Sequence, residues 1–394
     1  MKKIRFGIVG MGVIGNLHAR TITEDASDEF ALSAVADIVP DIAGKAGEKY
    51  GVPSFNDGLA LYDSGLVDAV IIATPHYWHP PLGIEAARRK IHVLCEKPLG
   101  VRVGPARAMI AECGRQGVAM GCMLMQRTRA TMMKMKELVD SGLIGEVFRV
   151  EMICSSWYRT QAYYDSGAWR GTWDGEGGGI LLNQAPHSLD LFQWIGGMPN
   201  RVTAVLATRA HRIEVENSAN IICQYDQPGK VGYIYATTAE LPGTERLMVV
   251  GDKGTLIAEG GKLRHGELDM AISEHLVKSS AASADHIPHP KAAWKDVEVA
   301  SGDQYGKHIE VTRAFARHLL HGTPLVVTGK EAINELEISN AAYLSGFNGG
   351  AVDLPVDAGA INELILRLER ERSTGKGKGM RAEADAAMAK LMGR

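Results

Sequence analysis

Residues 4–15 read IRFGIVGMGVIG, a short apolar run followed at once by glycines at positions 10, 12 and 15. This order predicts a buried strand, a tight turn and the start of a helix. In such a loop the first glycine permits the turn, the second lets the backbone approach a pyrophosphate, and the third lets helix and strand pack closely. The helix N-terminus then offers N–H groups to the phosphates. The stretch therefore predicts a dinucleotide site.

A second apolar run, residues 32–37, ends in an acid, Asp37. A carboxylate at this position can accept hydrogen bonds from both ribose hydroxyls and repels a 2′-phosphate, so NAD is favoured over NADP as the cofactor. The structural alternative is a glycine-rich turn with an unrelated surface aspartate. The cofactor contacts predicted from this motif are Gly10, Gly12, Val13, Ile14, Gly15 and Asp37.

Strand-like and helix-like segments alternate up to about residue 123. Helices are predicted at residues 16–20, 45–50, 81–89 and 104–116, and further strands at residues 69–73, 92–95 and 118–123. This alternation is typical of a doubly wound parallel sheet. We therefore predict an α/β protein whose residues 1–123 form an NAD-binding Rossmann domain.

The pattern changes after residue 123. Residues 145–152, 201–209, 219–225, 230–237 and 246–250 alternate polar and apolar side chains, as half-buried strands do. They predict a C-terminal α+β domain with a largely antiparallel, open-faced sheet, in which residues 251–254 form a turn. Residues 124–355 are assigned to substrate binding and oligomerisation, residues 265–291 to an irregular loop, and residues 356–394 to a helical C-terminal tail.

Composition excludes several classes of protein. The 394 residues carry 43 Lys and Arg against 46 Asp and Glu, a net charge of −3, so nothing favours nucleic acid or an anionic membrane as a partner. A small, neutral partner is expected. The five cysteines form no C-x-x-C pair and predict reduced packing residues, and no residues have the spacing of a metal site. With neither a leader-like nor a membrane-spanning stretch in this sequence, a cytoplasmic protein is predicted.

Aromatic residues are crowded between Trp157 and Trp173, where six of the 24 in the chain occur, interleaved with Arg159, Arg170 and Asp165. A buried mini-core and a binding surface are both compatible with this composition. Flat rings can cover the apolar C–H faces of a sugar while the charged groups bind its hydroxyls. The position of the cluster, just before a glycine run at 177–179, favours a substrate pocket for part of it.

The third and fourth predicted strands end in ATPHYWH, residues 73–79, and in EKP, residues 96–98. Together with the glycine loop, these motifs resemble the Gfo/Idh/MocA oxidoreductase family, which includes glucose–fructose oxidoreductase and inositol dehydrogenases. The resemblance continues through the glycines at 177–179, then Asn183, His187 and Asp190, and covers nearly the whole chain to about residue 355.

The resemblance implies roles for two residues. Lys97 would point toward the nicotinamide and stabilise the reacting oxygen, and His187 would be the general acid/base. The family commonly has aspartate where this chain has Asn183, so a complete Lys-Asp-His triad is not expected. The glycines at 177–179 are predicted to let the backbone approach the cofactor. For His187, the structural alternative is a histidine that is merely hydrogen-bonded.

Further contacts are predicted around this pair. Gln126, Arg127 and His79 lie where the substrate side and the nicotinamide end are expected, although packing or surface roles suit them equally. The remaining cofactor contacts are Thr74, Pro75, His79, Glu96 and Lys97. The predicted substrate contacts are Lys97, Gln126, Arg127, Trp157, Arg159, Tyr163, Tyr164, Trp169, Arg170, Asn183 and His187.

The leading hypothesis is an NAD-dependent dehydrogenase that oxidises a secondary alcohol of a sugar, glycoside or cyclitol. One alternative is an NAD-dependent glycosidase that acts by transient oxidation and elimination, as some relatives do. Another is a non-catalytic NAD-binding sensor, which the presence of both Lys97 and His187 disfavours. The open-faced sheet and the resemblance predict a homodimer or homotetramer.

Overall fold

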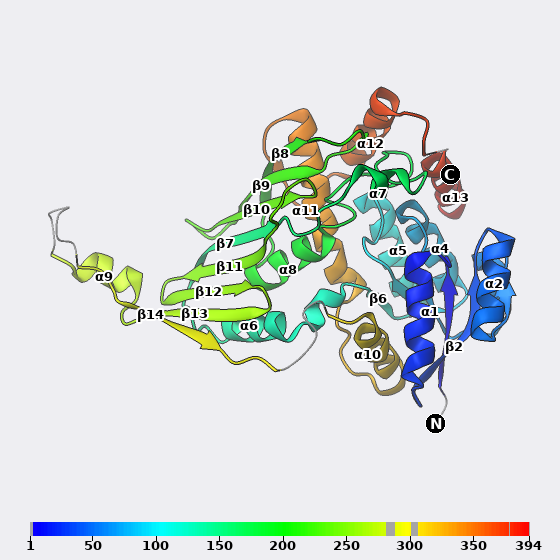
Figure 1. Cartoon of the computed structure of the whole chain (residues 1–394), viewed down its shortest axis with the longest axis horizontal. Helices are drawn as coiled ribbons and strands as arrows, with labels where there is room; N and C mark the ends of the chain where they lie inside the picture. The colour runs from blue at the N-terminus through cyan, green and yellow to red at the C-terminus, as the bar shows by residue number, and fades with distance from the viewer. Residues whose placement is uncertain (1–2, 281–287, 301–305, 378, 394) are drawn as a thin grey trace.

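The computed structural model describes residues 3–280, 288–300, 306–377 and 379–393 (Figure 1). Within these residues the chain forms two sheets. The first has parallel strands in the order β3-β2-β1-β4-β5-β6, which is the order of doubly wound dinucleotide-binding folds. Its strands are β1 Ile4–Val9, β2 Phe30–Ala36, β3 Ser54–Phe55, β4 Ala69–Ile72, β5 His92–Cys95 and β6 Met120–Cys122.

Helices connect these strands, as parallel pairing requires. They are α1 Val13–Asp25, α2 Pro40–Tyr50, α3 Gly58–Asp63, α4 His79–Arg88 and α5 Val103–Gln116, with a 3-10 turn, η1, at His76–Trp78. A late helix, α10 (His308–His321), returns to this domain and packs Phe315 into the same core as Phe6. The prediction of an N-terminal Rossmann domain is confirmed, and α10 adds a helix to the core of that domain.

The second sheet is mixed and mostly antiparallel, in the order β14-β13-β12-β11-β7-β10-β9-β8-β15. Only the β7–β10 pair runs parallel among the described pairings. The strands are β7 Val147–Cys154, β8 Arg201–Ala207, β9 Ser218–Gln224, β10 Val231–Thr237, β11 Glu245–Gly251, β12 Gly254–Glu259, β13 Lys262–Leu268, β14 Ala292–Val297 and β15 Val352–Asp353. The predicted sheet class is therefore confirmed.

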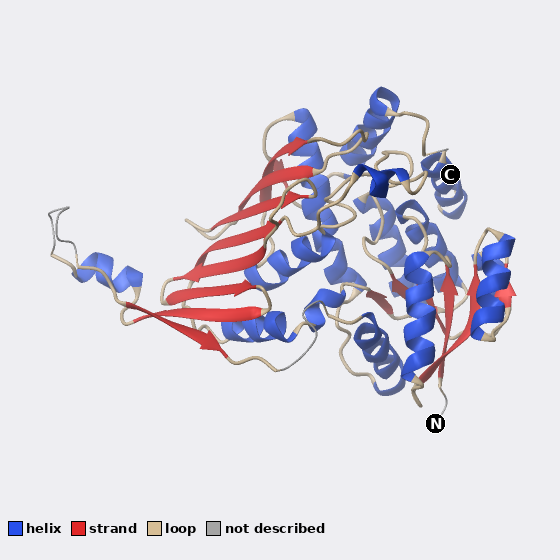
Figure 2. Cartoon of the chain, viewed as in Figure 1, coloured by secondary structure: helices blue, strands red, loops and turns tan. Residues whose placement is uncertain are grey.

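Helices cover one face of this sheet, between it and the Rossmann domain, and leave the other face bare (Figure 2). The elements of this half are η2 Met125–Thr128, α6 Ala130–Asp140, α7 Gln161–Asp165, α8 Pro186–Gly196, α9 Ile272–Lys278, α11 Gly329–Asn348, α12 Ala358–Arg372 and α13 Met380–Leu391. The last two helices turn back and lie beside α5 and α4 (Figure 1). In the described residues, no helix is long and apolar enough to cross a membrane.

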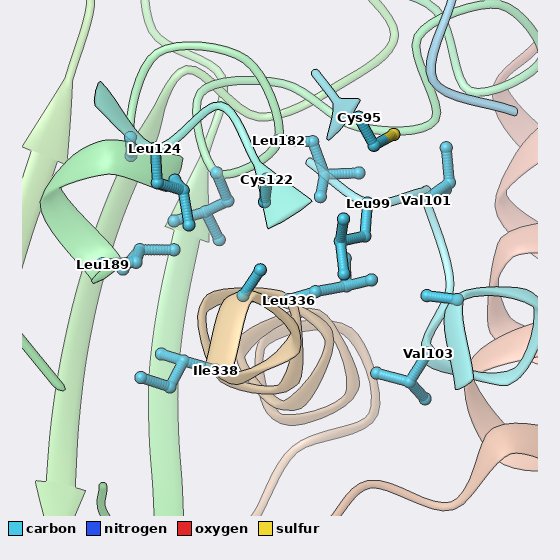
Figure 3. Close-up of a cluster of buried hydrophobic side chains, with 14 of the residues drawn as sticks. Cys95, Leu99, Val101, Val103, Cys122, Leu124, Leu182, Leu189, Leu336 and Ile338 are labelled. Carbon is cyan, nitrogen blue, oxygen red and sulfur yellow. The ribbon is translucent and has the colours of Figure 1, made fainter. Parts of the chain in front are cut away.

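One hydrophobic core joins the two sheets through α11. Leu336 and Ile338 of that helix pack with Cys95 and Cys122 of the Rossmann strands and with Leu189 of α8 (Figure 3). All five cysteines are buried and unpaired, as the sequence predicts. Because the core is continuous, the edge of the Rossmann sheet is held firmly against α8.

The prediction of an irregular loop at residues 265–291 is wrong in part. β13 extends to Leu268, and α9 follows at Ile272–Lys278. Residues 281–287 lie outside the described part of the chain. The division of the chain at residues 123 and 355 stays a prediction.

Candidate active site at the carboxyl edge of the Rossmann sheet

The glycine loop between β1 and α1 has the geometry of a phosphate cradle. A Cβ on Gly10 (φ +93°) would lie 2.7 Å from the Ala73 carbonyl oxygen, and one on Gly15 would lie 1.9 Å from the Gly10 carbonyl oxygen. Only glycine is accommodated at both positions. A Cβ on Gly12 would instead meet open space, and Gly12 caps α1 without a side-chain hydrogen bond. The free N–H groups at this helix start are therefore available to an anion.

The surroundings of this loop fit an adenosine dinucleotide. Val13 and Ile38 are 89% and 83% exposed, although both are apolar. Asp37 follows β2, and its carboxylate accepts hydrogen bonds from the backbone N–H groups of Met11 (2.8 Å) and Val39 (2.9 Å). Each oxygen keeps a further lone pair for a ribose hydroxyl. Exposed apolar side chains beside a positioned carboxylate suit a ligand with an apolar base and a polar sugar.

Glu96, at the end of β5, is held by a residue that the sequence analysis did not single out. His18 on α1 lies 2.6 Å from the Glu96 carboxylate through its Nε2 atom, and both side chains are buried. Burial raises the pKa of Glu96, but the hydrogen bond and charge of His18 outweigh this and lower it to about 2. Glu96 thus ties α1 to β5 in addition to any contact with the cofactor. The sequence signal for this contact is a polar residue, His18, on the buried face of α1.

Lys97 begins a chain of hydrogen bonds that leads to the aromatic cluster. Its ammonium donates to the Asn183 carbonyl oxygen at 2.7 Å. The Asn183 side-chain amide donates to the buried carboxylate of Glu176 and, at 3.4 Å, to the Tyr163 hydroxyl. Burial lowers the pKa of Lys97, and the nearby carboxylates, led by Glu96, oppose this shift. The structure therefore brings Lys97 and Asn183 together, with the contact made through the backbone of Asn183.

His187 lies in the first turn of α8 and is 7% exposed. Burial, followed by the charge of Lys97, holds its pKa well below the usual value of 6.5. No protein group in the described ranges bonds its buried Nδ1 atom. The ring is therefore neutral at neutral pH and close enough to Lys97 to respond to its charge.

The predictions for Gln126 and Arg127 are corrected by their burial. The Arg127 guanidinium binds Asp190 at 2.8 and 2.7 Å, donates to Glu331 at 3.1 Å and lies over the Trp194 ring. The Gln126 amide oxygen accepts from Arg129, and both Gln126 and Arg127 are almost fully buried. Both side chains are thus engaged by neighbouring protein groups, and the burial favours the packing alternative over a substrate contact.

His79 is also placed differently from the prediction. Its ring is fully buried, with Nδ1 2.7 Å from the Pro98 carbonyl and Nε2 2.7 Å from the Thr74 carbonyl. It fixes these two backbones, which is not the cofactor contact predicted for it. Thr74 and Pro75 themselves stay at the edge of the sheet, half-buried. The neighbouring His76, which bonds the Glu176 carbonyl at 3.0 Å and contacts the Trp169 ring, is the histidine of this motif that faces the aromatic cluster.

The aromatic cluster divides between core and surface. Trp173 and Tyr164 are buried, and the Tyr164 hydroxyl bonds Thr238 at 2.9 Å, so the substrate contact predicted for Tyr164 is corrected. Trp157, Tyr163 and Trp169 stay partly exposed. Tyr158 is 43% exposed, so these four rings are the part of the cluster that can cover a ligand.

The glycines at 177–179 pack against protein, contrary to the prediction that they approach the cofactor. A Cβ on Gly177 would lie 2.4 Å from Val101, one on Gly178 2.1 Å from the Tyr343 hydroxyl, and one on Gly179 1.7 Å from the Glu216 carbonyl oxygen. Their lack of side chains lets this segment pass between α11 and the strands. Their close packing fixes the start of the segment that leads to Asn183 and His187.

Buried acids surround the site, and the sequence analysis missed them. Glu335 on α11 is fully buried, and both of its carboxylate oxygens lack a hydrogen-bond partner in the described residues. Burial and the neighbouring Asp190 raise its pKa well above the usual value. Burial likewise raises the pKa of Glu176. These acids lie on segments without a recognisable motif, so only the fold reveals them.

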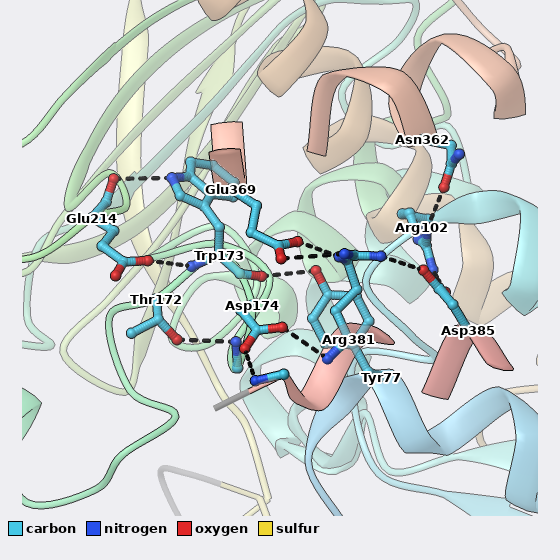
Figure 4. Close-up of polar contacts among 12 residues, drawn as sticks. Tyr77, Arg102, Thr172, Trp173, Asp174, Glu214, Asn362, Glu369, Arg381 and Asp385 are labelled. Atoms are coloured by element: carbon cyan, nitrogen blue, oxygen red, sulfur yellow. Dashed lines mark hydrogen bonds and ion pairs between the residues drawn. The ribbon is translucent and has the colours of Figure 1, made fainter. Parts of the chain in front are cut away.

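The C-terminal segment is hydrogen-bonded to Asp174, which follows the aromatic cluster (Figure 4). Asp174 accepts from the backbone N–H groups of Gly379 and Arg381, and the Arg381 guanidinium binds Glu369 and Asp385. Asp385 also binds Arg102 of the Rossmann domain. The described ranges contain no group of three or more His, Cys, Asp or Glu side chains arranged to hold a metal ion.

Comparisons with known proteins agree with this geometry. A model of an oxidoreductase family with an NAD-binding Rossmann fold matches residues 4–123, and the GFO/IDH/MocA C-terminal domain matches residues 132–257. The myo-inositol 2-dehydrogenase of Thermotoga maritima is 28% identical over 351 residues, 87% of this chain and 96% of that protein. The trans-1,2-dihydrobenzene-1,2-diol dehydrogenase of Mus musculus is 30% identical over 258 residues, 64% of this chain and 73% of that protein.

A solved structure is similar as well. The WlbA dehydrogenase from Bordetella pertussis, in complex with NADH and UDP-GlcNAcA, has a TM-score of 0.75 and 28% identity, covering 90% of this chain and all of that one. The fold and the glycine loop define an NAD-binding oxidoreductase with a Rossmann domain. Within this class, the chain belongs to the Gfo/Idh/MocA family.

Proposed function

We propose that the chain oxidises a secondary alcohol of a sugar, glycoside or cyclitol, with NAD as the hydride acceptor. The observation that carries the proposal is that Lys97, whose ammonium donates to the Asn183 carbonyl, and the buried His187, whose pKa the charge of Lys97 lowers, belong to one site beside the carboxyl edge of the dinucleotide-binding sheet. In the oxidation of an alcohol, an unprotonated imidazole can take the hydroxyl proton and an ammonium can stabilise negative charge on the oxygen.

The two side chains divide the work on the substrate hydroxyl. Lys97 uses one N–H on the Asn183 carbonyl and keeps two for the reacting oxygen, where its charge stabilises the negative charge that develops. His187 accepts the hydroxyl proton on a ring nitrogen, since its lowered pKa leaves the ring unprotonated. NAD, which the loop at Gly10–Gly15 and the Asp37 carboxylate would hold, would supply the hydride acceptor when bound, so that the alcohol could become a ketone.

The substrate class is supported by the site and by the relatives. Trp157, Tyr163 and Trp169 offer partly exposed rings to the C–H faces of a polyol, and Asn183 lies between them and Lys97. The relatives named above are dehydrogenases of an inositol and of a cyclic diol. In this proposal residues 1–123 bind the cofactor and residues 124–355 supply most of the substrate contacts. Asp37 beside the ribose position favours NAD over NADP.

A substrate panel tests the proposal. Inositols, hexoses, uronic acids and glycosides are incubated with NAD or NADP while the absorbance of the reduced nicotinamide is followed. We expect NADH formation with a polyol and a preference for NAD. Release of the aglycone from an aryl glycoside without accumulation of NADH would instead indicate the redox-neutral glycosidase. NAD binding without turnover across the panel would indicate a sensor.

We also propose that the bare face of the second sheet forms a homodimer or homotetramer interface. Val205, Ile222 and Tyr233 expose apolar side chains on this face, around a hollow of about 500 Å³. Apolar side chains gathered on an open sheet are typical of a surface that another subunit covers.

A further inference from the structure

Two arginines of the aromatic cluster flank one ring. The guanidinium carbons of Arg159 and Arg170 lie 4.8 Å and 4.4 Å from the centroid of the Tyr163 ring. Arg170 also lies 4.5 Å from the Trp169 ring and donates to the Tyr163 hydroxyl at 2.5 Å. Arg159 lies 5.5 Å from the Trp157 ring. Stacking on rings fixes the planes of both guanidinium groups and leaves N–H edges for hydrogen bonds.

Neither arginine has an ion-pair partner in the described part of the chain. Side-chain hydrogen bonds of Arg159 and Arg170 go to the Tyr158 carbonyl and to Tyr163. Arginines that are more deeply buried, or partly buried as these two are, pair with acids: Arg102 with Asp385, Arg127 with Asp190, Arg129 with Glu245 and Arg381 with Glu369. The charge of Arg170 lowers the pKa of one acid, Glu176, whose carboxylate accepts hydrogen bonds from the Gly171 N–H and the Asn183 side-chain amide. Among the described residues, no carboxylate therefore forms an ion pair with either guanidinium, although the charge of Arg170 acts on Glu176.

Two buried donors in this cluster lack acceptors. The Arg159 Nε atom and the Trp157 Nε1 atom are shielded from solvent and bond no group in the described ranges. A buried N–H without an acceptor is unfavourable, and a ligand oxygen would relieve it. Arg159 lies over both the Tyr163 and the Trp157 rings, so the two unmet donors lie beside the guanidinium that lacks an ion pair.

The arginine pair is connected to the reacting centre. The Tyr163 hydroxyl that accepts from Arg170 also accepts from Asn183, whose carbonyl holds the Lys97 ammonium. Arg170 also borders a hollow of about 450 Å³ that Arg212, Arg372 and Lys376 line, with Glu214 as the one acid among the described lining residues. Clustered cations of this kind raise the local potential for an anion.

We propose that Arg159 and Arg170 bind a carboxylate or phosphate group of the substrate, so that the enzyme acts on an anionic carbohydrate. The inference rests on the proposed function, because it assigns the substrate class to the same site. It replaces the expectation of a neutral partner, which relied on the net charge of the whole chain. Planar guanidinium groups are suited to either anion through paired N–H···O bonds.

Binding measurements test the proposal independently of turnover. Calorimetry is done on the full chain with NADH, which cannot accept a hydride, and with matched sets of probes: glucose, glucuronate and glucose 6-phosphate; galactose, galacturonate and galactose 6-phosphate; and myo-inositol and its monophosphate. We expect an anionic member of at least one set to bind about 30-fold or more tightly than its neutral parent. Whether the carboxylate or the phosphate is preferred identifies the anion.

Variants locate the effect. Arg159→Gln and Arg170→Gln should weaken binding of the preferred anion much more than binding of its neutral parent, while Arg170→Lys should retain part of the preference. Arg209→Gln, an exposed arginine of the same domain, is the matched control and should have no effect. The absence of anion preference in every set, or equal weakening of anion and parent, overturns the proposal. If the enzyme oxidises a neutral polyol and shows no preference for anions, the anion-binding proposal fails and the proposed oxidation stands. If it binds anions selectively but turns over no substrate, the proposed oxidation fails and the anion-binding proposal stands.

Discussion

Lys97 and His187 carry pKa shifts in the same direction, and each shift suits the role proposed for its residue. Burial lowers both values, and the charge of Lys97 lowers that of His187 further. A neutral histidine can accept a proton, and a protonated lysine can stabilise negative charge on an oxygen. Lysine and histidine are common on protein surfaces, so it is the burial of these two side chains, which lowers their pKa values, that suits them to the proposed chemistry.

A pH profile follows from these shifts. His187 must be unprotonated, so kcat/KM for oxidation should fall only as the pH drops through its lowered pKa, well below 6.5. Lys97 must be protonated, so the alkaline limb should begin below 10.5. Steady-state rates of the wild type and of His187→Asn should show that the variant is slower and has lost the acid limb. An acid limb unchanged in the variant would assign that titration to another group.

Arg127 is expected to stabilise the fold and not to bind substrate. Replacing it with Met leaves Asp190 as a buried charge without its partner, so the free energy of unfolding should fall by about 3–5 kcal/mol. Urea denaturation measures this loss. Arg201→Met, which removes an exposed ion pair to Asp353, is the control and should change stability much less. Full stability of Arg127→Met with loss of substrate affinity would restore the original prediction.

Residue types in short motifs were enough to predict part of the site. Gly10, Asp37 and Lys97 follow strand ends, where parallel sheets bind ligands, so their positions could be predicted from the sequence. Whether a polar side chain faces the site or the core depends on partners far along the chain. Arg127 is buried because Asp190, 63 residues later, pairs with it, and Glu335 belongs to a helix without any motif.

At the scale of elements, the C-terminal segment supports the substrate loop. Lys376, between α12 and α13, donates to the carbonyl oxygens of Tyr164 (2.5 Å) and Arg170 (3.1 Å), while Thr374 binds Glu214. Together with the contacts of Asp174 (Figure 4), these bonds hold the loop that carries Trp169 and Arg170. Both family models end before this segment.

Lys376→Met should loosen this loop. The variant loses two hydrogen bonds from an ammonium, which corresponds to about 1–2 kcal/mol of unfolding free energy. We expect a higher KM for the carbohydrate, an unchanged affinity for NAD, and faster tryptic cleavage near Arg170. Lys390→Met, on the exposed side of α13, is the matched control. Unchanged KM and cleavage in Lys376→Met would show that the segment does not position the loop.

Element prediction succeeded where apolar residues recur with a regular period. The β11–β12 hairpin forms at the Gly-Asp-Lys-Gly turn, as predicted. It failed at β13, because the inward positions of that strand include His265, which is buried but does not produce an apolar alternation. The C-terminal helices were predicted, but nothing in their composition indicates that they return to the Rossmann domain.

At the scale of the whole molecule, one continuous core fixes the two sheets around the site, and the second sheet leaves a bare apolar face. If that face is a subunit interface, the wild type should sediment as a homo-oligomer at micromolar concentration. Val205→Lys, which places a charge on the bare face where Val205 is 68% exposed, should shift it toward the monomer without loss of NAD binding. Val277→Lys on α9 is the exposed control. A wild type that is monomeric at this concentration would contradict the interface.

Long-range packing limits what the sequence predicts at this scale. Phe315 completes a core whose strand residue, Phe6, lies near the other end of the chain. A pattern within one segment contains no information about such a partner. The two sheet classes could therefore be predicted, while the return of α10 to the first sheet and the joining of the two sheets through α11 could not.

The most direct test of the central claim, hydride transfer assisted by Lys97, is a single-turnover measurement with Lys97→Met on a polyol that the wild type oxidises. We predict that NADH formation in this variant falls by about 100-fold or more while the affinity for NAD stays within about twofold of the wild type, because the lost group acts on the reacting oxygen. NADH formation at the wild-type rate would contradict the account.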